Sequence, residues 1–358
     1  MRIAIVTDAW APQTNGVVTT LVATARELSR LGHSTGILSP EGLACLPCPS
    51  YPEIRLALWP GPFIAGRLMA LRPHAVHIAT EGPLGAAARG HCRSRGVPFT
   101  TSYHTRYPEY LAERWPIPRA VSYAWLRRFH GAAARTFVSS ESLREELACE
   151  GFGALHLWRR GVDSWRFHPR HPPHPSLRDL PRPIMVYAGR LAVEKNLTAF
   201  LDLKMPGTAL LIGDGPQRAT LAARYPRAVF TGYRFGEELA ALLAGSDVFV
   251  FPSLTDTFGI AMIEALACGL PVAAFPVPGP LDVLRPGVTG VMSLDLAEAI
   301  RGALRLDHAR CAAAAADFTW AAATGQFLAG LEPIPLRARA RLATGVSAII
   351  GSRAGERS

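Results

Sequence analysis

The feature that most constrains the fold is a repeated alternation of short apolar runs with longer amphipathic segments. In the first half of the chain, residues 3–6 form an apolar run of strand length, and further strands are predicted near 34–38, 75–78, 99–102 and 136–139. Helical patterns such as 17–30 and 84–95 lie between them. The alternation starts again further along, with apolar runs at 184–187, 209–212, 228–231, 248–251 and 272–275. Because parallel strands are joined by crossover helices, this pattern predicts an α/β protein with two parallel, doubly wound sheets.

A proline-rich stretch, residues 168–183, separates the two alternating halves. Proline is disfavoured inside helices and central strands, so such a stretch is typical of a linker. A chain of 358 residues is also long enough for two domains. The predicted parts are an N-terminal domain 1–170, a linker 171–183, a C-terminal domain 184–316, a helix 317–331 and a flexible tail 332–358.

Two cations follow the first apolar run of the second half. Arg190 and Lys195 stand in a loop that begins at Gly189 and leads into a helical segment. Ligands of doubly wound sheets bind beyond the carboxyl ends of strands, and a pyrophosphate leaving group needs positive charge as its bond breaks. Lys195 is one of two lysines in a chain with 36 arginines, which indicates a requirement for a compact ammonium. The alternative is solvated surface charge.

Two carboxylates, Asp256 and Glu264, flank the start of a predicted helix at Gly259. The positive end of a helix dipole and its free N–H groups favour phosphates and sugar hydroxyls. Glu264 lies on the helix itself, at a spacing that can turn it toward the loop that carries Asp256. A loop acid and a helical acid can together hold a polyhydroxylated ligand, so this segment predicts a sugar-nucleotide site.

Further glycine turns follow other predicted strands. Asp214 and Gly215 come after the run 209–212, where a tight turn suits the close approach of a base or a ribose. Gly16 precedes the first predicted helix, where it can bring backbone N–H groups to a phosphate. A plain tight turn and a plain helix-capping glycine are the respective alternatives.

The loop after the fourth predicted strand gathers many functional groups. It contains Tyr103, His104, Arg106 and Glu109, a collection that stability alone does not require at a strand end. His104 can bind a sugar hydroxyl or an acceptor, and a hydrogen-bonded structural histidine is the alternative. The segment 114–135 that follows is both basic and aromatic, as expected of an interfacial helix. A half-buried helix with snorkelling arginines would have the same composition.

Positive charge is concentrated in the first half. The net charge is +10; residues 1–170 hold 20 Arg and Lys against 12 Asp and Glu, whereas residues 183–330 hold 11 against 13. The first half is therefore predicted to face an anionic membrane surface or an acidic acceptor, and not a nucleic acid, for which no recognition helix is evident. An arginine-biased composition is the alternative. The N-terminus resembles no leader and no apolar run could span a bilayer, so we expect a cytoplasmic protein, peripheral on the inner face of the membrane.

Several motifs resemble those of a known family. The segments GRLAVEKN, GDGP and TDTFGIAMIEALACGLPVAA are similar to the nucleotide-sugar-binding half of retaining GT-B glycosyltransferases of family four, the glycosyl transferases group 1. The segments TDAWAPQTNGVVTT, EGPLG, TSYHTRYPEY and RGVD resemble the subgroup of GDP-mannose-dependent lipid mannosyltransferases and sulfoquinovosyl-diacylglycerol synthases. The resemblance extends over residues 1–330. It implies two Rossmann-like domains with a cleft between them, a helix 317–331 that crosses back to the first domain, and no bound metal or other cofactor.

The resemblance also implies roles for individual residues. The implied catalytic residues are Arg190 and Lys195 on the donor diphosphate, Asp256 on the donor sugar hydroxyls, and His104 on the sugar or the acceptor. Further donor contacts would come from Gly16, Gly189, Asp214, Gly215, Glu264 on the ribose, and the backbone N–H groups of Phe258 and Gly259. On the acceptor side the residues would be Tyr103, Arg106 and Glu109.

We therefore expect a retaining hexosyltransferase, with mannose favoured, that uses a nucleoside diphosphate sugar and a hydroxyl acceptor on a lipid or a glycan. Asp256 departs from the usual pattern of the family, which has glutamate at this position, so the identity of the donor sugar is left open. Two alternatives stay open: a hydrolysing sugar-nucleotide 2-epimerase of the same architecture, and a non-catalytic sugar-nucleotide-binding protein. A Rossmann dehydrogenase is disfavoured because no GxGxxG follows either first strand.

Overall fold

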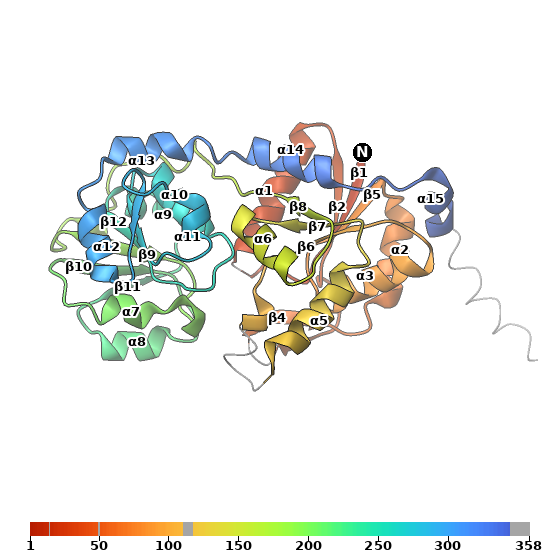
Figure 1. Ribbon diagram of the computed structural model, residues 1–358, viewed down its shortest axis with the longest axis horizontal. Coiled ribbons are helices and arrows are strands. Elements are labelled where there is room, and N and C mark those ends of the chain that lie inside the picture. The colour runs from red at the N-terminus through yellow and green to blue at the C-terminus, as the bar shows by residue number, and fades with distance from the viewer. Residues whose placement is uncertain (14, 49–50, 110–116, 344–358) are drawn as a thin grey trace, which may run out of the picture. The chain divides into compact units, whose positions relative to one another are not determined.

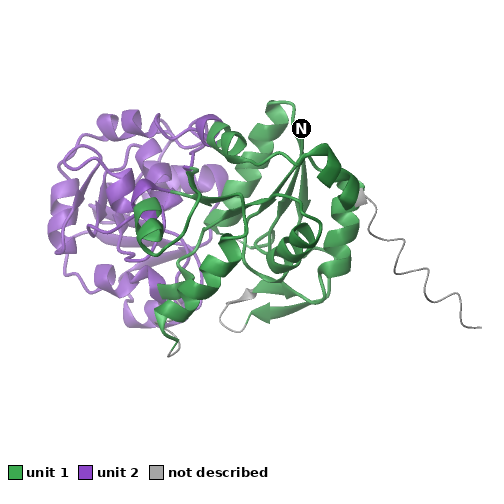
Figure 2. Cartoon of the chain, turned by 45° about the vertical axis from the view of Figure 1, so that its right-hand side comes forward, with its two compact units in different colours: residues 1–139, 144–158, 324–358 green, residues 140–143, 159–323 purple. Residues whose placement is uncertain are grey.

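The structure is a computed structural model that describes all residues except 14, 49–50, 110–116 and 344–358 (Figure 1). The chain forms two compact units (Figure 2). Unit 1 consists of Met1–Ser139, Arg144–Trp158 and Thr324–Ser358, and unit 2 consists of Ser140–Leu143 and Arg159–Ala323. Each unit contains one six-stranded sheet in which the paired strands are parallel. The prediction of two parallel, doubly wound sheets is therefore confirmed.

The unit 1 sheet has the strand order β2-β1-β5-β6-β7-β8. Its strands are β1 (Arg2–Val6), β2 (Ser34–Leu38), β5 (Ala75–Ile78), β6 (Thr100–Ser102), β7 (Arg135–Val138) and β8 (Leu155–Leu157). A separate antiparallel hairpin consists of β3 (Cys45–Cys48) and β4 (Tyr51–Ala57). The chain leaves β1 toward β2 on one side and later returns to β5 on the other, so the order reverses between β1 and β5. Ligands of doubly wound sheets bind at such switch points.

Helices cover both faces of the unit 1 sheet. The helices are α1 (Gly16–Arg30), α2 (Gly61–Leu71), α3 (Pro83–Ser94), α5 (Arg119–His130), α6 (Glu141–Cys149), α14 (Trp320–Gly330) and α15 (Leu336–Ala343). Neighbouring residues of β5 point to opposite faces: Val76 and Ile78 pack with α2, α3 and α15, whereas His77 packs against Phe327 of α14. Alternation along a buried strand therefore explains why every residue of β5 is apolar or fully hydrogen-bonded.

The unit 2 sheet has the order β11-β10-β9-β12-β13-β14, with its switch point between β9 and β12. Its strands are β9 (Ile184–Ala188), β10 (Thr208–Ile212), β11 (Val229–Gly232), β12 (Val248–Phe251), β13 (Val272–Ala274) and β14 (Gly290–Met292). The helical segments are η1 (Pro175–Leu177), η2 (Val193–Lys195), α7 (Leu197–Leu201), α8 (Arg218–Arg224), α9 (Gly236–Ala244), α10 (Ile260–Ala267), α11 (Pro280–Val283), α12 (Leu296–Ala303) and α13 (His308–Ala315). Val186 belongs to the core on one face and Tyr187 to the core on the other. Both faces of this sheet are therefore covered.

Two features differ from the boundaries predicted from the sequence. The segment from Arg159 through the proline-rich stretch belongs to unit 2, because Phe167 and Leu177 are buried in the core of that unit. The expected flexible tail contains α15, because Ile334, Ala338 and Leu342 recur every four residues and pack into the core of unit 1. The chain re-enters unit 1 within α14, at Thr324. The rest of the predicted tail lies outside the described residues.

Candidate functional site

The loops after β9 and β12 meet at the switch point of the unit 2 sheet. The Lys195 ammonium Nζ donates to Oδ1 of Asp256 at 2.5 Å. Two more hydrogen bonds join the same loops: Asn196 Nδ2 donates to the Pro252 carbonyl at 3.2 Å, and Ser253 Oγ donates to the Glu194 carbonyl at 3.3 Å. Because strands β9 and β12 are neighbours, loops that are sixty residues apart in the sequence become one structure.

Lys195 and Asp256 form a partly buried ion pair. Their side chains are 19% and 18% exposed, so the interaction is less screened by solvent than a surface salt bridge. The sequence assigned the lysine to a diphosphate and the aspartate to sugar hydroxyls, and the structure places the two groups in contact. Arg190 lies in the same loop, where its carbonyl accepts a hydrogen bond from the buried Tyr187 hydroxyl at 2.9 Å.

The glycine turns after β9 and β10 touch through their backbones. Gly189 N donates to the Ile212 carbonyl at 2.9 Å, and both Gly189 and Gly213 have positive φ, 152° and 151°. A Cβ atom on Gly213 would lie 1.8 Å from the Gly189 carbonyl oxygen. Only glycine permits this approach, so the two turns hold each other in place. A Cβ atom on Gly215 would lie 2.5 Å from the Leu191 carbonyl oxygen.

Asp214 has intramolecular partners in this turn. Its carboxylate accepts from the Gly215 N–H and from Arg218 Nη1, both at 2.7 Å. The side chain therefore shapes its own turn and ties it to the first residue of α8. Its predicted contact with a donor stays a prediction.

Helix α10 starts where the sequence places it. Gly259 has φ of 84°, and a Cβ there would lie 2.7 Å from Met262 Cε and 2.8 Å from Phe251 Cζ. The Phe258 side chain is buried in the core, so this residue can offer a ligand only its backbone. The conformation at Gly259 thus follows from both the turn and the packing beneath it.

Glu264 lies in the second turn of α10 and is partly buried. Burial raises the pKa of its carboxyl group to about 7, and the nearby Arg166 guanidinium offsets part of that rise. A carboxyl group that titrates near neutral pH in a binding region is a marker of function. Sequence reasoning missed Arg166, whose one signal is its position three residues after the RGVD motif.

The switch point of unit 1 holds a buried carboxylate that the sequence did not single out. Asp8 follows β1, and its side chain accepts from Leu84 N at 2.9 Å, from Gly85 N at 3.3 Å and from the Thr80 hydroxyl at 2.8 Å. A Cβ on Gly82 would lie 2.5 Å from Asp8 Cγ. The EGPLG motif therefore builds the start of α3 around Asp8, and burial raises the pKa of this carboxyl group.

Gly16 is the exposed first residue of α1. The Asn15 side chain caps this helix by accepting from the N–H groups of Val17 and Val18, each at 3.0 Å. The predicted contact of Gly16 with a donor phosphate stays a prediction.

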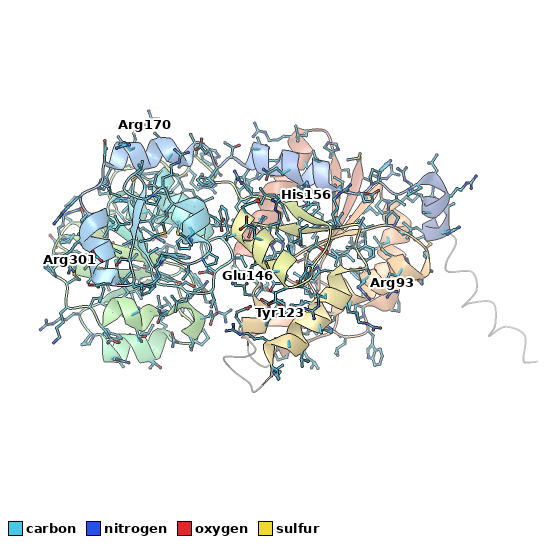
Figure 3. All side chains as sticks on the ribbon, in the orientation of Figure 1. Arg93, Tyr123, Glu146, His156, Arg170 and Arg301 are labelled. Carbon is cyan, nitrogen blue, oxygen red and sulfur yellow. The ribbon has the colours of Figure 1, made fainter. Side chains whose placement is uncertain are left out.

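The loop after β6 lies in a polar region of unit 1. Arg106 donates two hydrogen bonds to Glu146 of α6, at 2.9 and 2.6 Å, and Glu109 accepts from the Tyr123 hydroxyl of α5 at 2.9 Å. Figure 3 labels Glu146 on α6 and Tyr123 on α5.

The other two predicted residues of this loop differ in burial. Tyr103 is almost fully buried, whereas His104 is partly exposed with its ring edge against Trp158, centroids 5.8 Å apart. The acceptor contacts predicted for Tyr103, His104, Arg106 and Glu109 stay predictions. The start of the predicted interfacial segment, 114–116, lies outside the described residues, and α5 forms its central part. In the part of the chain that the structure describes, no group of three or more His, Cys, Asp or Glu side chains could hold a metal ion.

Comparison with known proteins defines the class. The chain matches the family model Glycosyltransferase Family 4 over residues 14–166 and the family model Glycosyl transferases group 1 over residues 182–306. With its two parallel sheets it has the GT-B glycosyltransferase fold. Within that class, the chain belongs to the family four, group 1 glycosyltransferases and is a transferase that uses a nucleotide sugar. The resemblance read from the motifs is confirmed.

Named relatives cover most of the chain. It is 34% identical over 316 residues to a Mycobacterium tuberculosis protein named GDP-mannose-dependent alpha-mannosyltransferase, covering 82% of this chain and 83% of that relative. It is 33% identical over 269 residues to Sulfoquinovosyl transferase SQD2 of Arabidopsis thaliana, covering 70% and 52%. Among solved structures, Anabaena Alr3699/HepE in complex with UDP-glucose superposes with a TM-score of 0.68 at 16% identity, covering 92% of this chain and 98% of that one. The last likeness concerns the fold alone.

Proposed function

We propose that this protein transfers mannose from GDP-mannose to a hydroxyl group of a lipid acceptor, with retention of configuration. The name of the Mycobacterium tuberculosis relative supports the donor, and the basic first half of the chain supports an acceptor at an anionic membrane surface. The observation that carries the proposal is the Lys195–Asp256 ion pair at the switch point of unit 2. It offers one cation and one carboxylate where doubly wound sheets bind their ligands.

In this proposal the ion pair separates when the donor binds. Lys195 moves to the diphosphate, joined by Arg190 from the same loop, and the freed Asp256 carboxylate accepts hydrogen bonds from the sugar hydroxyls. The touching turns at Gly189 and Gly213 bring the backbone close to the nucleotide. Glu264, in its ionised form, accepts hydrogen bonds from the ribose hydroxyls.

Retention follows from attack on the same face of the sugar. The bond from C1 to the diphosphate oxygen breaks, and a bond from C1 to the acceptor oxygen forms on the side that the leaving group departs from. The acceptor proton passes to the departing phosphate oxygen. The two cations stabilise the charge that grows on the diphosphate, which is the largest contribution that a preorganised site makes.

A thermal-shift panel of GDP-, UDP- and ADP-sugars tests the donor. A donor present at 100 times its Kd stabilises the protein by about 2.7 kcal/mol, and a weaker ligand at the same concentration stabilises it less. A larger shift with GDP-mannose than with the other sugars therefore supports the proposal. A larger shift with UDP-glucose would refute the donor while leaving the class intact. Incubation with GDP-mannose and diacylglycerol-based acceptors then tests transfer, and NMR of the product gives its anomeric configuration. Epimerised free sugar in place of a glycolipid would identify the enzyme as an epimerase.

The only other lysine provides a matched control for the role of Lys195. Lys195→Ala should lower kcat by about 10²–10³-fold, because one charge-stabilising group is lost. Lys204 is exposed and outside the site, so Lys204→Ala should keep full activity. Near-normal turnover of the Lys195 variant would contradict its assignment to the diphosphate.

A further inference from the structure

Four of the described helices of unit 1 contain arginine and no acidic residue. These are α2, α3, α5 and α15, and together they carry nine arginines. We call them the basic layer. Six of the nine arginines are exposed: Arg67, Arg93, Arg119, Arg128, Arg337 and Arg341. None of these six forms an ion pair with another of the residues that the structure describes.

The four helices form one continuous layer. Ala338 and Leu342 of α15 share a buried cluster with Ile64 and Leu68 of α2, and α2 packs along α3. Arg89 of α3 then ties that helix to α5, because its Nε and Nη2 donate to the carbonyls of Phe129 and Arg128, at 2.9 and 2.6 Å. Figure 1 shows α15, α2, α3 and α5 following one another along one side of the unit 1 sheet. Arg93 of α3, which Figure 3 labels, is exposed.

An arginine-rich composition alone does not explain this distribution. The nine-residue helix α6 contains Glu141, Glu145 and Glu146, so acidic residues occur in the same half of the chain. They are absent from the four helices of the basic layer. The layer thus presents a field of one sign, which attracts an anionic partner.

Large apolar side chains are exposed beside these arginines. Trp125 and Val121 of α5 are 51% and 60% exposed, and Leu336 at the start of α15 is 79% exposed. Trp59, just before α2, is 89% exposed and has φ of 50°. The left-handed region is unfavourable for a bulky residue. Because the Trp59 side chain is exposed, no burial of its apolar surface offsets this conformational cost. A partner that buries Trp59 would supply the missing gain.

We propose that the basic layer docks on an anionic lipid bilayer. The arginines contact headgroup phosphates, and Trp59 and Trp125 enter the interfacial region, where tryptophan is favoured. Exposed aliphatic residues among the cations favour a bilayer over a soluble polyanion, which has no apolar phase to receive them. No helix of the described residues is long and apolar enough to cross a bilayer. The inference adds the docking surface to the proposed lipid-directed function, and its test does not require that function.

Sedimentation of the full chain with lipid vesicles tests the proposal. We expect binding to phosphatidylglycerol vesicles at low salt, little binding to phosphatidylcholine vesicles, and loss of binding as salt shortens the screening length. Each arginine at the surface contributes about a fivefold gain in binding, so Arg93→Gln with Arg337→Gln should weaken it about 25-fold. The matched pair Arg305→Gln with Arg310→Gln, on exposed positions of unit 2, should leave it unchanged. Equal losses in the two pairs would overturn the proposed surface.

The tryptophans separate a bilayer from a soluble polyanion. Trp59→Ser with Trp125→Ser should reduce vesicle binding and remove the blue shift of tryptophan fluorescence that vesicles induce. If this variant binds vesicles as the parent does, and heparin binds both equally, the surface binds polyanions and the bilayer proposal is wrong. Transfer to a short-chain acceptor in detergent should be the same in the arginine variants and the parent. Vesicle binding without any transfer would refute the proposed function and leave the docking surface standing.

Discussion

The carboxyl group of Glu264 gives the sharpest test of the site, because its charge should change within the neutral range. Its pKa of about 7 in the folded protein compares with 4.5 for the unperturbed group. Between these values the folded protein binds a proton that the unfolded chain releases. Stability is therefore lost as pH rises through this window, and the loss is complete above about pH 7. The difference amounts to about 3 kcal/mol, at about 1.4 kcal/mol for each pH unit.

Glu264→Gln isolates this effect, since glutamine resembles the protonated acid in shape and never ionises. At pH 5 the variant and the parent should unfold at similar temperatures. At pH 8 the unit 2 transition of the variant should lie about 6–12 °C higher, from roughly 2–4 °C for each kcal/mol in a unit of this size. Thermal unfolding at a series of pH values measures the difference. If the difference in unfolding temperature between variant and parent does not change with pH, ionisation of this carboxyl group does not destabilise the folded protein, and the reasoning is refuted.

Donor binding should show the opposite preference. If the ionised carboxylate accepts the ribose hydroxyls, GDP-mannose should bind about tenfold more weakly at pH 6 than at pH 8, because most of the free protein is then protonated. Glu264→Gln should bind about 10–100-fold more weakly at pH 8 and lose the dependence, since hydrogen bonds to a charged group are lost. Isothermal titration with the nucleotide sugar measures both. A variant that is more stable yet keeps full affinity would leave Glu264 with no role at the ribose.

Two further substitutions probe the supports of the proposed sites. Gly213→Ala should displace the turn at Gly189, lowering both the melting temperature and the donor affinity in a thermal-shift assay, whereas Gly66→Ala, with open space around its Cβ, should leave both unharmed. A Gly213 variant with parental affinity would show that the two turns move independently. Glu146→Gln leaves the buried Arg106 guanidinium with a weaker partner. It should lower the free energy of unfolding of unit 1 by about 1.5–3 kcal/mol without changing donor affinity. Unchanged stability would refute a structural role for this pair.

The sheets were the predictable part of this protein. The runs 184–187, 209–212 and 248–251 match β9, β10 and β12, because a strand buried on both faces is apolar along its length. The glycines at the strand ends were predictable for a similar reason, since tight turns need them. The strand β14 was missed because its apolar part is only two residues long, between Gly290 and Ser293, whereas the equally short β13 lies in the longer apolar run 272–275.

The partnerships between loops were not predictable. Which side chain meets Lys195 depends on the neighbour relation of β9 and β12, and no local pattern encodes strand order. Asp8 escaped notice for the same reason, because its partners are more than seventy residues away on the far side of a crossover. The helix α15 was assigned to a flexible tail because a high arginine content masked the apolar residues at every fourth position.

The ion pair between Lys195 and Asp256 competes with any ligand that would bind only one of these two groups. Under the proposed roles, inorganic phosphate can draw the lysine away only by stranding the aspartate, and a free sugar can engage the aspartate only by stranding the lysine. A ligand that carries both a diphosphate and a hexose satisfies the two groups at once. The site would then bind the intact nucleotide sugar in preference to inorganic phosphate or a free sugar.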